Sequence, residues 1–154
     1  MMPTAETISK LLADIVGRPV TAKKLPPIPL TGPGMRVVAV YESDDDSIAG
    51  ACICDLTFAA QAAAALVMLP SATAQESIVA GKCSPPLLEN LGEILSMCRQ
   101  WFQQSGGHVR SPRLYQTPCT FPPQIVKLLA TPKRRLDLEV AISGYRSGRL
   151  TVAE

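Results

Sequence analysis

Two glutamates and a serine stand at a spacing that brings their side chains together on one face of a helix. Glu89, Glu93 and Ser96 are separated by four and three residues, which makes them neighbours along an α-helix. Gln100 and Gln103 fall on the same face. Paired carboxylates are candidates for acid–base chemistry, but two of them do not make an enzyme, and a solvated surface has the same composition. These residues therefore define a face that meets either solvent or a partner.

The segment that must position this face is residues 83–104, CSPPLLENLGEILSMCRQWFQQ. Ser84 is suited to cap the first turn, and Pro85 and Pro86 stand where a missing amide hydrogen costs nothing. The spacing predicts a helix that is buried along the side opposite the polar face. The apolar stripe on that side consists of Leu87, Leu91, Ile94, Leu95, Cys98, Trp101 and Phe102.

The sequence LENLGEILS, residues 88–96, resembles the signature helix of the CheX/CheC-like chemotaxis phosphatases. In that family an acidic or small polar residue is followed four positions later by Glu and three further on by Asn, around a core of the form L-G-E-I. Glu89, Glu93 and Ser96 occupy those three positions, and residues 91–94 match the core. The family's Asn is replaced by Ser96.

The resemblance implies a fold, a partner and a set of roles. Members of the family lay this helix across the phosphorylation site of a response-regulator receiver domain, where the Glu pairs with the receiver's lysine and the Asn orients the attacking water. The receiver supplies the aspartyl phosphate and the magnesium, so no cofactor or metal of the chain's own is expected. Carried over, Glu93 and Ser96 are the candidate catalytic residues, and Glu89, Asn90, Glu93 and Gln100 the candidate partner-binding residues.

Replacing the Asn should weaken any such chemistry, because a serine hydroxyl is shorter than an amide and rotates freely. Gln100 has an amide, but it lies about 6 Å further along the helix at 1.5 Å per residue. Asn90 lies at the flank of the polar face. Two functions stay open: binding of a phosphorylated receiver domain with weak or lost phosphatase activity, or a noncatalytic, dimerising adaptor or binding domain of the same fold. A small-molecule enzyme is the least favoured of three functions, because the sequence contains no nucleophile motif and no phosphate-binding motif.

Length and composition predict one globular domain over residues 1–154, with 47% hydrophobic and 18% charged residues. The formal net charge of +2 is spread along the chain, so we expect no nucleic-acid partner. The densest basic run, residues 133–135, reads as a solvated loop. The longest apolar run, residues 62–69, is far shorter than the ~20 residues of a membrane span, so none is expected.

Five cysteines without a C-x-x-C pair, and the single His108, indicate neither a zinc site nor a disulfide framework. We interpret the thiols as reduced and acting as small apolar side chains, which favours a cytoplasmic location. Asp44, Asp45 and Asp46 lack the spacing of a calcium loop and predict no metal site.

The remaining elements predict an α+β fold, with helices packed on one face of a largely antiparallel sheet and the other face or an edge available for self-association. A helix follows Thr4 and ends at Gly17. A proline-rich run at residues 23–34 cannot enter a sheet interior and indicates an extended surface connection, and the weak helical turn at 75–80 precedes the main helix. Further helices are predicted at 57–69 and 122–129. Strands are predicted at 35–41, 47–55, 109–120 (an edge), 135–144 and 149–153.

Overall fold

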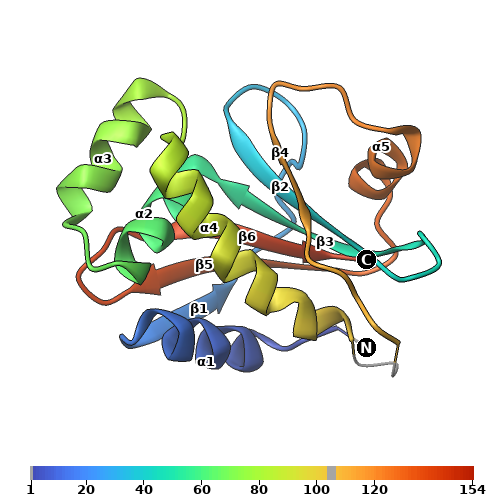
Figure 1. The fold of residues 1–154 in the computed structure, drawn as a ribbon, viewed down its shortest axis with the longest axis horizontal. Coiled ribbons are helices and arrows are strands. Elements are labelled where there is room, and N and C mark those ends of the chain that lie inside the picture. Colours follow the sequence, from blue (N-terminus) through green and yellow to red (C-terminus); the bar gives the residue numbers. More distant parts are fainter. Residues whose placement is uncertain (1, 104–106) are drawn as a thin grey trace.

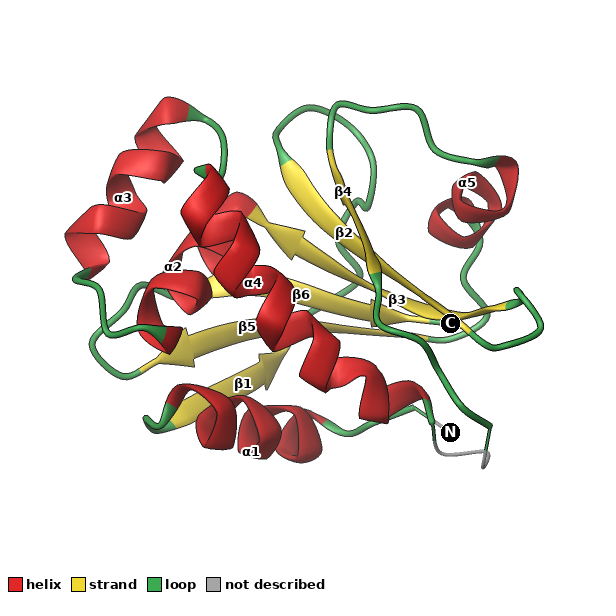
Figure 2. Cartoon of the chain, in the orientation of Figure 1, coloured by secondary structure: helices red, strands yellow, loops and turns green. Residues whose placement is uncertain are grey.

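A computed structural model describes residues 2–103 and 107–154. Within these ranges the strands form one antiparallel sheet in the order β1-β5-β6-β3-β2-β4 (Figures 1 and 2). The strands are β1 (Val20–Lys24), β2 (Arg36–Glu42), β3 (Ile48–Asp55), β4 (Arg113–Gln116), β5 (Arg135–Ile142) and β6 (Gly148–Ala153). The helices are α1 (Ala5–Val16), α2 (Leu56–Leu66), α3 (Ser71–Ala80), α4 (Pro85–Met97), the 3₁₀ helix η1 (Cys98–Phe102) and α5 (Pro123–Ala130). The predicted α+β architecture is confirmed.

The main core lies between the sheet and the helices α1, α2 and α4, which cross one sheet face in Figure 1. Alternate strand residues such as Val37, Ala39 and Tyr41 point into it, as the two-residue period of a strand requires. Four of the cysteines are buried free thiols, and burial raises the pKa of Cys52 to about 12. A thiol with that pKa stays neutral, so these cysteines pack as small apolar groups, as expected.

The second face of the sheet is not free, which corrects the prediction that all helices lie on one side. Ile125 and Leu129 of α5 pack on this face against β2 and β3, in a second cluster that also contains Val38 and Ile53. Over β1, β5 and β6 the same face is polar. There Lys23 pairs in register with Glu139, which pairs in turn with Arg149, so charged cross-strand neighbours occupy the uncovered part.

The prediction that residues 23–34 form an extended surface connection is wrong at its start, because Lys23 and Lys24 belong to β1. This strand pairs only with β5 and forms one edge of the sheet. It was missed because five residues of mixed burial give little periodicity. The proline-rich part that follows does run outside the sheet, and Leu30 is buried against the second face.

Arg135 begins β5, as the strand predicted at 135–144 requires, but its side chain is not solvated, as was expected for the run 133–135. Its guanidinium donates to Asp137 Oδ1 at 2.6 Å and Oδ2 at 2.9 Å, and to the carbonyl of Ile28 at 2.6 Å. Thr151 also donates to Asp137 Oδ1, at 2.8 Å. Burial alone would raise the pKa of Asp137, but the hydrogen bonds from Arg135 and Thr151 outweigh it and hold the pKa below its ordinary value. This ion pair ties the proline-rich segment to the sheet.

The other helices and strands agree with their predictions, but some of them begin or end at different residues. Thr4 caps α1 by accepting from the Thr7 amide at 3.1 Å, and Gly17 ends it in the left-handed conformation, both as predicted. The helix predicted at 57–69 ends at Leu66, the weak turn at 75–80 is the ten-residue α3, and the edge strand shortens to β4. No helix in residues 2–103 and 107–154 is long and apolar enough to cross a membrane.

Candidate functional site

The central helix of the sequence is α4, followed without a break by η1. Pro85 and Pro86 fill its first positions as predicted, and Ser84 stands at the N-cap with extended backbone angles. Ser84 makes no capping hydrogen bond with its side chain, so that part of the prediction is wrong; its carbonyl accepts from the Leu88 amide at 2.8 Å. The last predicted residue, Gln104, lies outside the described residues.

One side of α4 is held firmly in the main core. The whole predicted apolar stripe is buried, and the phenolic hydroxyl of Tyr41, on β2, donates to the carbonyl of Leu95 at 2.7 Å. The Tyr41 ring stacks on Phe102 of η1 with a centroid separation of 4.5 Å. Burial raises the pKa of Tyr41 well above its ordinary value, so the hydroxyl remains a donor. The strand therefore fixes both the rotation and the C-terminal end of the helix.

The opposite side of α4 carries the predicted polar set at the surface. Glu89, Glu93 and Gln100 are exposed, whereas Asn90 and Ser96 are partly buried. In the described ranges the side chains of Glu89, Asn90, Glu93 and Ser96 make no ion pair or hydrogen bond with another residue. We call these four residues, with Met97 described below, the α4 face. It presents two carboxylates that the rest of the described chain leaves without a cation.

Gln100 is exposed near this face, and its amide nitrogen makes one hydrogen bond within the chain. Its Nε2 donates to the carbonyl of Met97 at 3.2 Å, at the point where α4 passes into η1. This contact satisfies one of the carbonyl groups left open at a helix end. The side chain therefore contributes to the α4–η1 junction.

Met97 was missed by the sequence reasoning. It is 46% exposed and stands four residues after Glu93, on the same side of the helix. Its position outside the apolar stripe was the signal, because an apolar side chain beyond the buried side of an amphipathic helix must face water. Exposed methionines are common in adaptable binding surfaces.

Two neighbouring elements limit the α4 face on one flank. A Cβ atom placed on Gly92 would meet Leu114 of β4 at 3.4 Å, so the edge strand lies against the helix at that point. Arg99 of η1 donates to the hydroxyl of Ser111 at 3.4 Å, in the segment that leads into β4. The edge strand and its preceding segment thus cover the flank that contains Gly92 and leave the carboxylates open.

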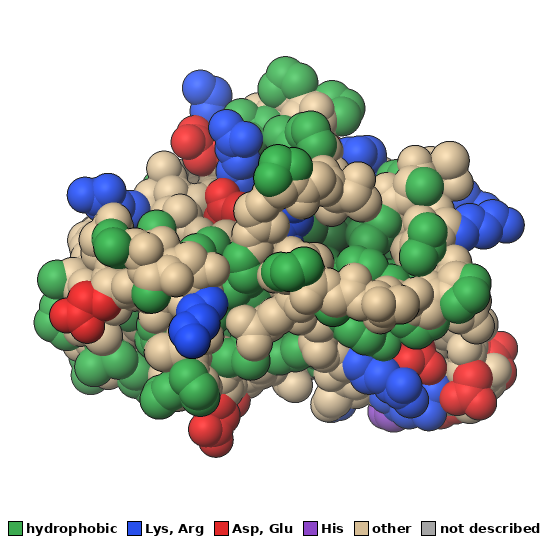
Figure 3. Space-filling view, turned by 90° about the horizontal axis from the view of Figure 1, so that it is seen from above, with side chains coloured by type: hydrophobic (Ala, Val, Ile, Leu, Met, Phe, Trp, Pro, Cys, Tyr) green, Lys and Arg blue, Asp and Glu red, His purple; other side chains and the backbone are tan. Residues whose placement is uncertain are grey.

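The aspartates at residues 44–46 are engaged in contacts within the protein. Asp44 lies 3.0 Å from His108, Asp46 accepts from Arg110 at 2.6 Å, and Asp45 accepts from the hydroxyl of Ser47 at 2.6 Å. Figure 3 shows acidic and basic side chains gathered with the histidine at one corner of the surface. Among the described residues, no three His, Cys, Asp or Glu side chains are grouped to hold a metal ion.

Comparison with solved structures shows which fold this is. No protein-family model matches the sequence, and no curated protein matches it. The FliM middle domain from H. pylori matches with a TM-score of 0.62 and 15% identity, over 97% of this chain and 83% of that one. Thermotoga maritima FliY matches with a TM-score of 0.61 and 14% identity, over 99% and 91%. The chain has the CheC-like fold.

A third match is a chain in the crystal structure of the FliM–SpeE complex from H. pylori, with a TM-score of 0.67, 12% identity and coverage of 97% of this chain and 80% of that one. At such identities the agreement concerns the path of the backbone. Residue roles on the α4 face must therefore be argued from this chain's own chemistry.

Proposed function

We propose that this protein binds the receiver domain of a phosphorylated response regulator through the α4 face, with weak or lost phosphatase activity. The observation that carries the proposal is the pair of exposed carboxylates, Glu89 and Glu93. They have no cationic partner in the described chain, and they stand on a helix whose opposite side is fixed in the main core. The CheC-like fold supports a role in chemotaxis or two-component signalling.

The chemistry of the α4 face fits binding better than turnover. A carboxylate on a fixed helix is suited to pair with a lysine ammonium, and the half-exposed Met97 adds apolar area beside it. Hydrolysis of an aspartyl phosphate needs, in addition, a group that holds water in line with phosphorus. Ser96 offers a short hydroxyl that is partly buried, and the amide of Gln100 is engaged with Met97.

The missing amide favours the second candidate, a noncatalytic adaptor or binding domain that keeps the partner surface without the chemistry. Solved structures of this fold include FliM in complexes with SpeE and with FliG, so the fold has accommodated protein partners in those cases. A homodimer would serve such an adaptor. Reduced cysteines agree with a cytoplasmic setting for either candidate.

Charge reversal at Glu93 tests the binding surface. Glu93→Lys should weaken binding to a receiver domain encoded beside this chain, activated with beryllofluoride as a phosphate mimic, by about tenfold, because an attractive charge pair becomes repulsive. Glu76→Lys, the same reversal at an exposed position of α3, is the matched control and should leave affinity unchanged. Calorimetric titration measures both. Equal affinities for the native protein and Glu93→Lys would refute the proposed surface.

Turnover is tested at Ser96. Single-turnover loss of phosphate from the labelled receiver should be slow with the native protein and rise by about tenfold with Ser96→Asn, which corresponds to about 1.4 kcal/mol in the barrier. Glu93→Ala should be slower than the native protein. Fast native turnover that Glu93→Ala abolishes would establish a phosphatase that works with serine. An inert Ser96→Asn variant that still binds the receiver would leave only the binding domain.

A further inference from the structure

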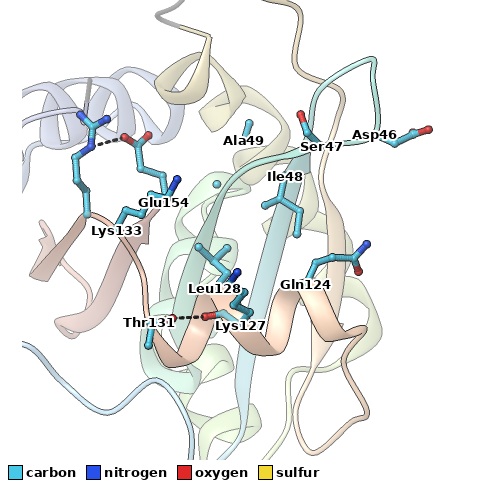
Figure 4. A pocket seen from close by; sticks show the side chains of 12 residues that line it. Asp46, Ser47, Ile48, Ala49, Gln124, Lys127, Leu128, Thr131, Lys133 and Glu154 are labelled. Carbon is cyan, nitrogen blue, oxygen red and sulfur yellow. Dashed lines mark hydrogen bonds and ion pairs between the residues drawn. The ribbon is translucent and has the colours of Figure 1, made fainter.

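A groove of about 510 Å³ lies between α5 and the beginning of β3 (Figure 4), and no residue of the α4 face lines it. Its volume falls within the range typical of ligand pockets. We call it the α5 groove. The residues that line it include Ile48 and Ala49 of β3, Lys127 and Leu128 of α5, and Lys133 and Glu154 from the strand ends beside it.

The α5 groove exists because β3 is longer than the partner strand that flanks it. Pairing between β3 and β6 covers Ala51 to Cys54 and stops. Glu154, the residue after β6, forms two backbone hydrogen bonds with Arg134, of 3.0 and 3.1 Å. In the described chain, Ile48 and Gly50 pair with β2 on one side, Ala49 lies between them at an irregularity of that pairing, and no strand pairs with these three residues on the other side. Because an antiparallel strand offers amides and carbonyls on both sides, a strand edge without a neighbour can pair with an added strand.

In the lining of the α5 groove, two basic side chains have no acidic partner within the described chain. Both acidic residues in its lining are already paired, since Glu154 lies 3.0 Å from Arg134 and Asp46 lies 2.6 Å from Arg110. Lys127 and Lys133 are exposed and make no ion pair with any residue the structure describes. The groove thus combines an apolar floor, open strand backbone and two free ammonium groups.

We propose that the α5 groove binds an extended, acidic segment of a partner protein, which adds to β3 beside residues 48–50. Addition of a strand to an open sheet edge gives affinity through backbone hydrogen bonds and specificity through alternate side chains. Apolar side chains of the segment face Ile48 and Leu128, and its carboxylates lie near Lys127 and Lys133. This inference is independent of receiver binding, because no residue of the α4 face takes part.

The experiment uses the whole protein and the labelled probe peptide Ac-Glu-Val-Glu-Val-Glu-Val-Glu-NH₂, measured by fluorescence anisotropy and by amide NMR shifts. Binding should shift the amides of residues 48–50. The double reversal Lys127→Glu with Lys133→Glu should weaken binding at least tenfold. The matched control, Lys10→Glu with Lys82→Glu, makes the same charge change at two exposed sites elsewhere and should weaken it less than twofold.

A second peptide, N-methylated at alternate residues, keeps the charge and removes strand hydrogen bonds, so it should bind the native protein at least tenfold more weakly. This comparison needs no protein variant. Equal loss in both double variants, equal binding of the two peptides, shifts confined to other residues, or no binding at millimolar peptide would each overturn the proposal. A concentration-dependent dimer that the Lys127 and Lys133 reversals dissociate would also overturn it, because the occupant would then be a second copy.

Discussion

Removing one buried hydroxyl, in Tyr41→Phe, should loosen the attachment of α4 to the sheet. The residue is fully buried, and its hydroxyl donates to the Leu95 carbonyl at 2.7 Å. The substitution keeps the ring and therefore its stacking on Phe102. What is lost is one buried hydrogen bond, and the Leu95 carbonyl loses a partner that water cannot easily replace.

The expected loss follows from that geometry. A net hydrogen bond is worth about 1 kcal/mol, and a buried acceptor left without its partner raises the cost to about 3 kcal/mol. For a domain of this size each kcal/mol lowers Tm by roughly 2–4 °C. We therefore expect Tm to fall by roughly 2–12 °C, with faster hydrogen exchange in the last turn of α4.

The matched control is Tyr145→Phe. The Tyr145 hydroxyl makes an equally short bond to the Leu69 carbonyl, at 2.6 Å, but this tyrosine is only partly buried, so water can take the place of the lost group. Its cost should be below about 1 kcal/mol. Thermal and urea unfolding of both variants provide the measurement. If Tyr41→Phe costs no more than Tyr145→Phe, the hydroxyl does not anchor the helix and the reasoning fails.

Two further predictions concern glycines and pH. Gly148→Ala should destabilise the protein by about 3 kcal/mol or more in urea unfolding, because the added Cβ would overlap the backbone of Phe58. Gly92→Ala, whose Cβ would be in ordinary contact with β4, should stabilise it by up to about 1 kcal/mol through helix propensity. An unchanged stability of Gly148→Ala would contradict the packing. The folded pKa of Asp137 lies below its unfolded value of 3.8, so its stabilisation is complete above pH 3.8 and falls as the pH drops through the folded pKa. Asp137→Asn should show a smaller loss of stability below pH 3.8, and an unchanged pH profile would exclude this role.

Local patterns predicted the parts of the fold that local forces determine. The stripe from Leu87 to Phe102 needs only the helical period, and the strand around Leu138 needs only the period of two. The exposure of Glu89 and Glu93 follows from the same helical period. Met97 stands outside the buried stripe, so the same period indicates that it is exposed, but this exposure was not predicted.

The missed features depend on pairing between distant residues. β1 is defined by its pairing with β5, more than 110 positions along the chain, and nothing within Val20–Lys24 shows it. Whether α5 covers one sheet face or the other depends on the order of the strands. Arg135 belonged to a run that looked solvated, although its spacing of two from Asp137 places both side chains on one side of a strand.

The sheet order also determines when the protein can fold during synthesis. β5 and β6, from the end of the described chain, lie between β1 and β3, which come from its beginning. A nascent chain that has completed α4 therefore holds β1 without a neighbour and β3 with one open side. Folding of the sheet must wait until residue 153 has left the ribosome, and until then these strands are exposed to aggregation. Synonymous codons that slow translation after α5 should therefore lower the yield of folded protein, and a chaperone that shields β1 and β3 should restore it.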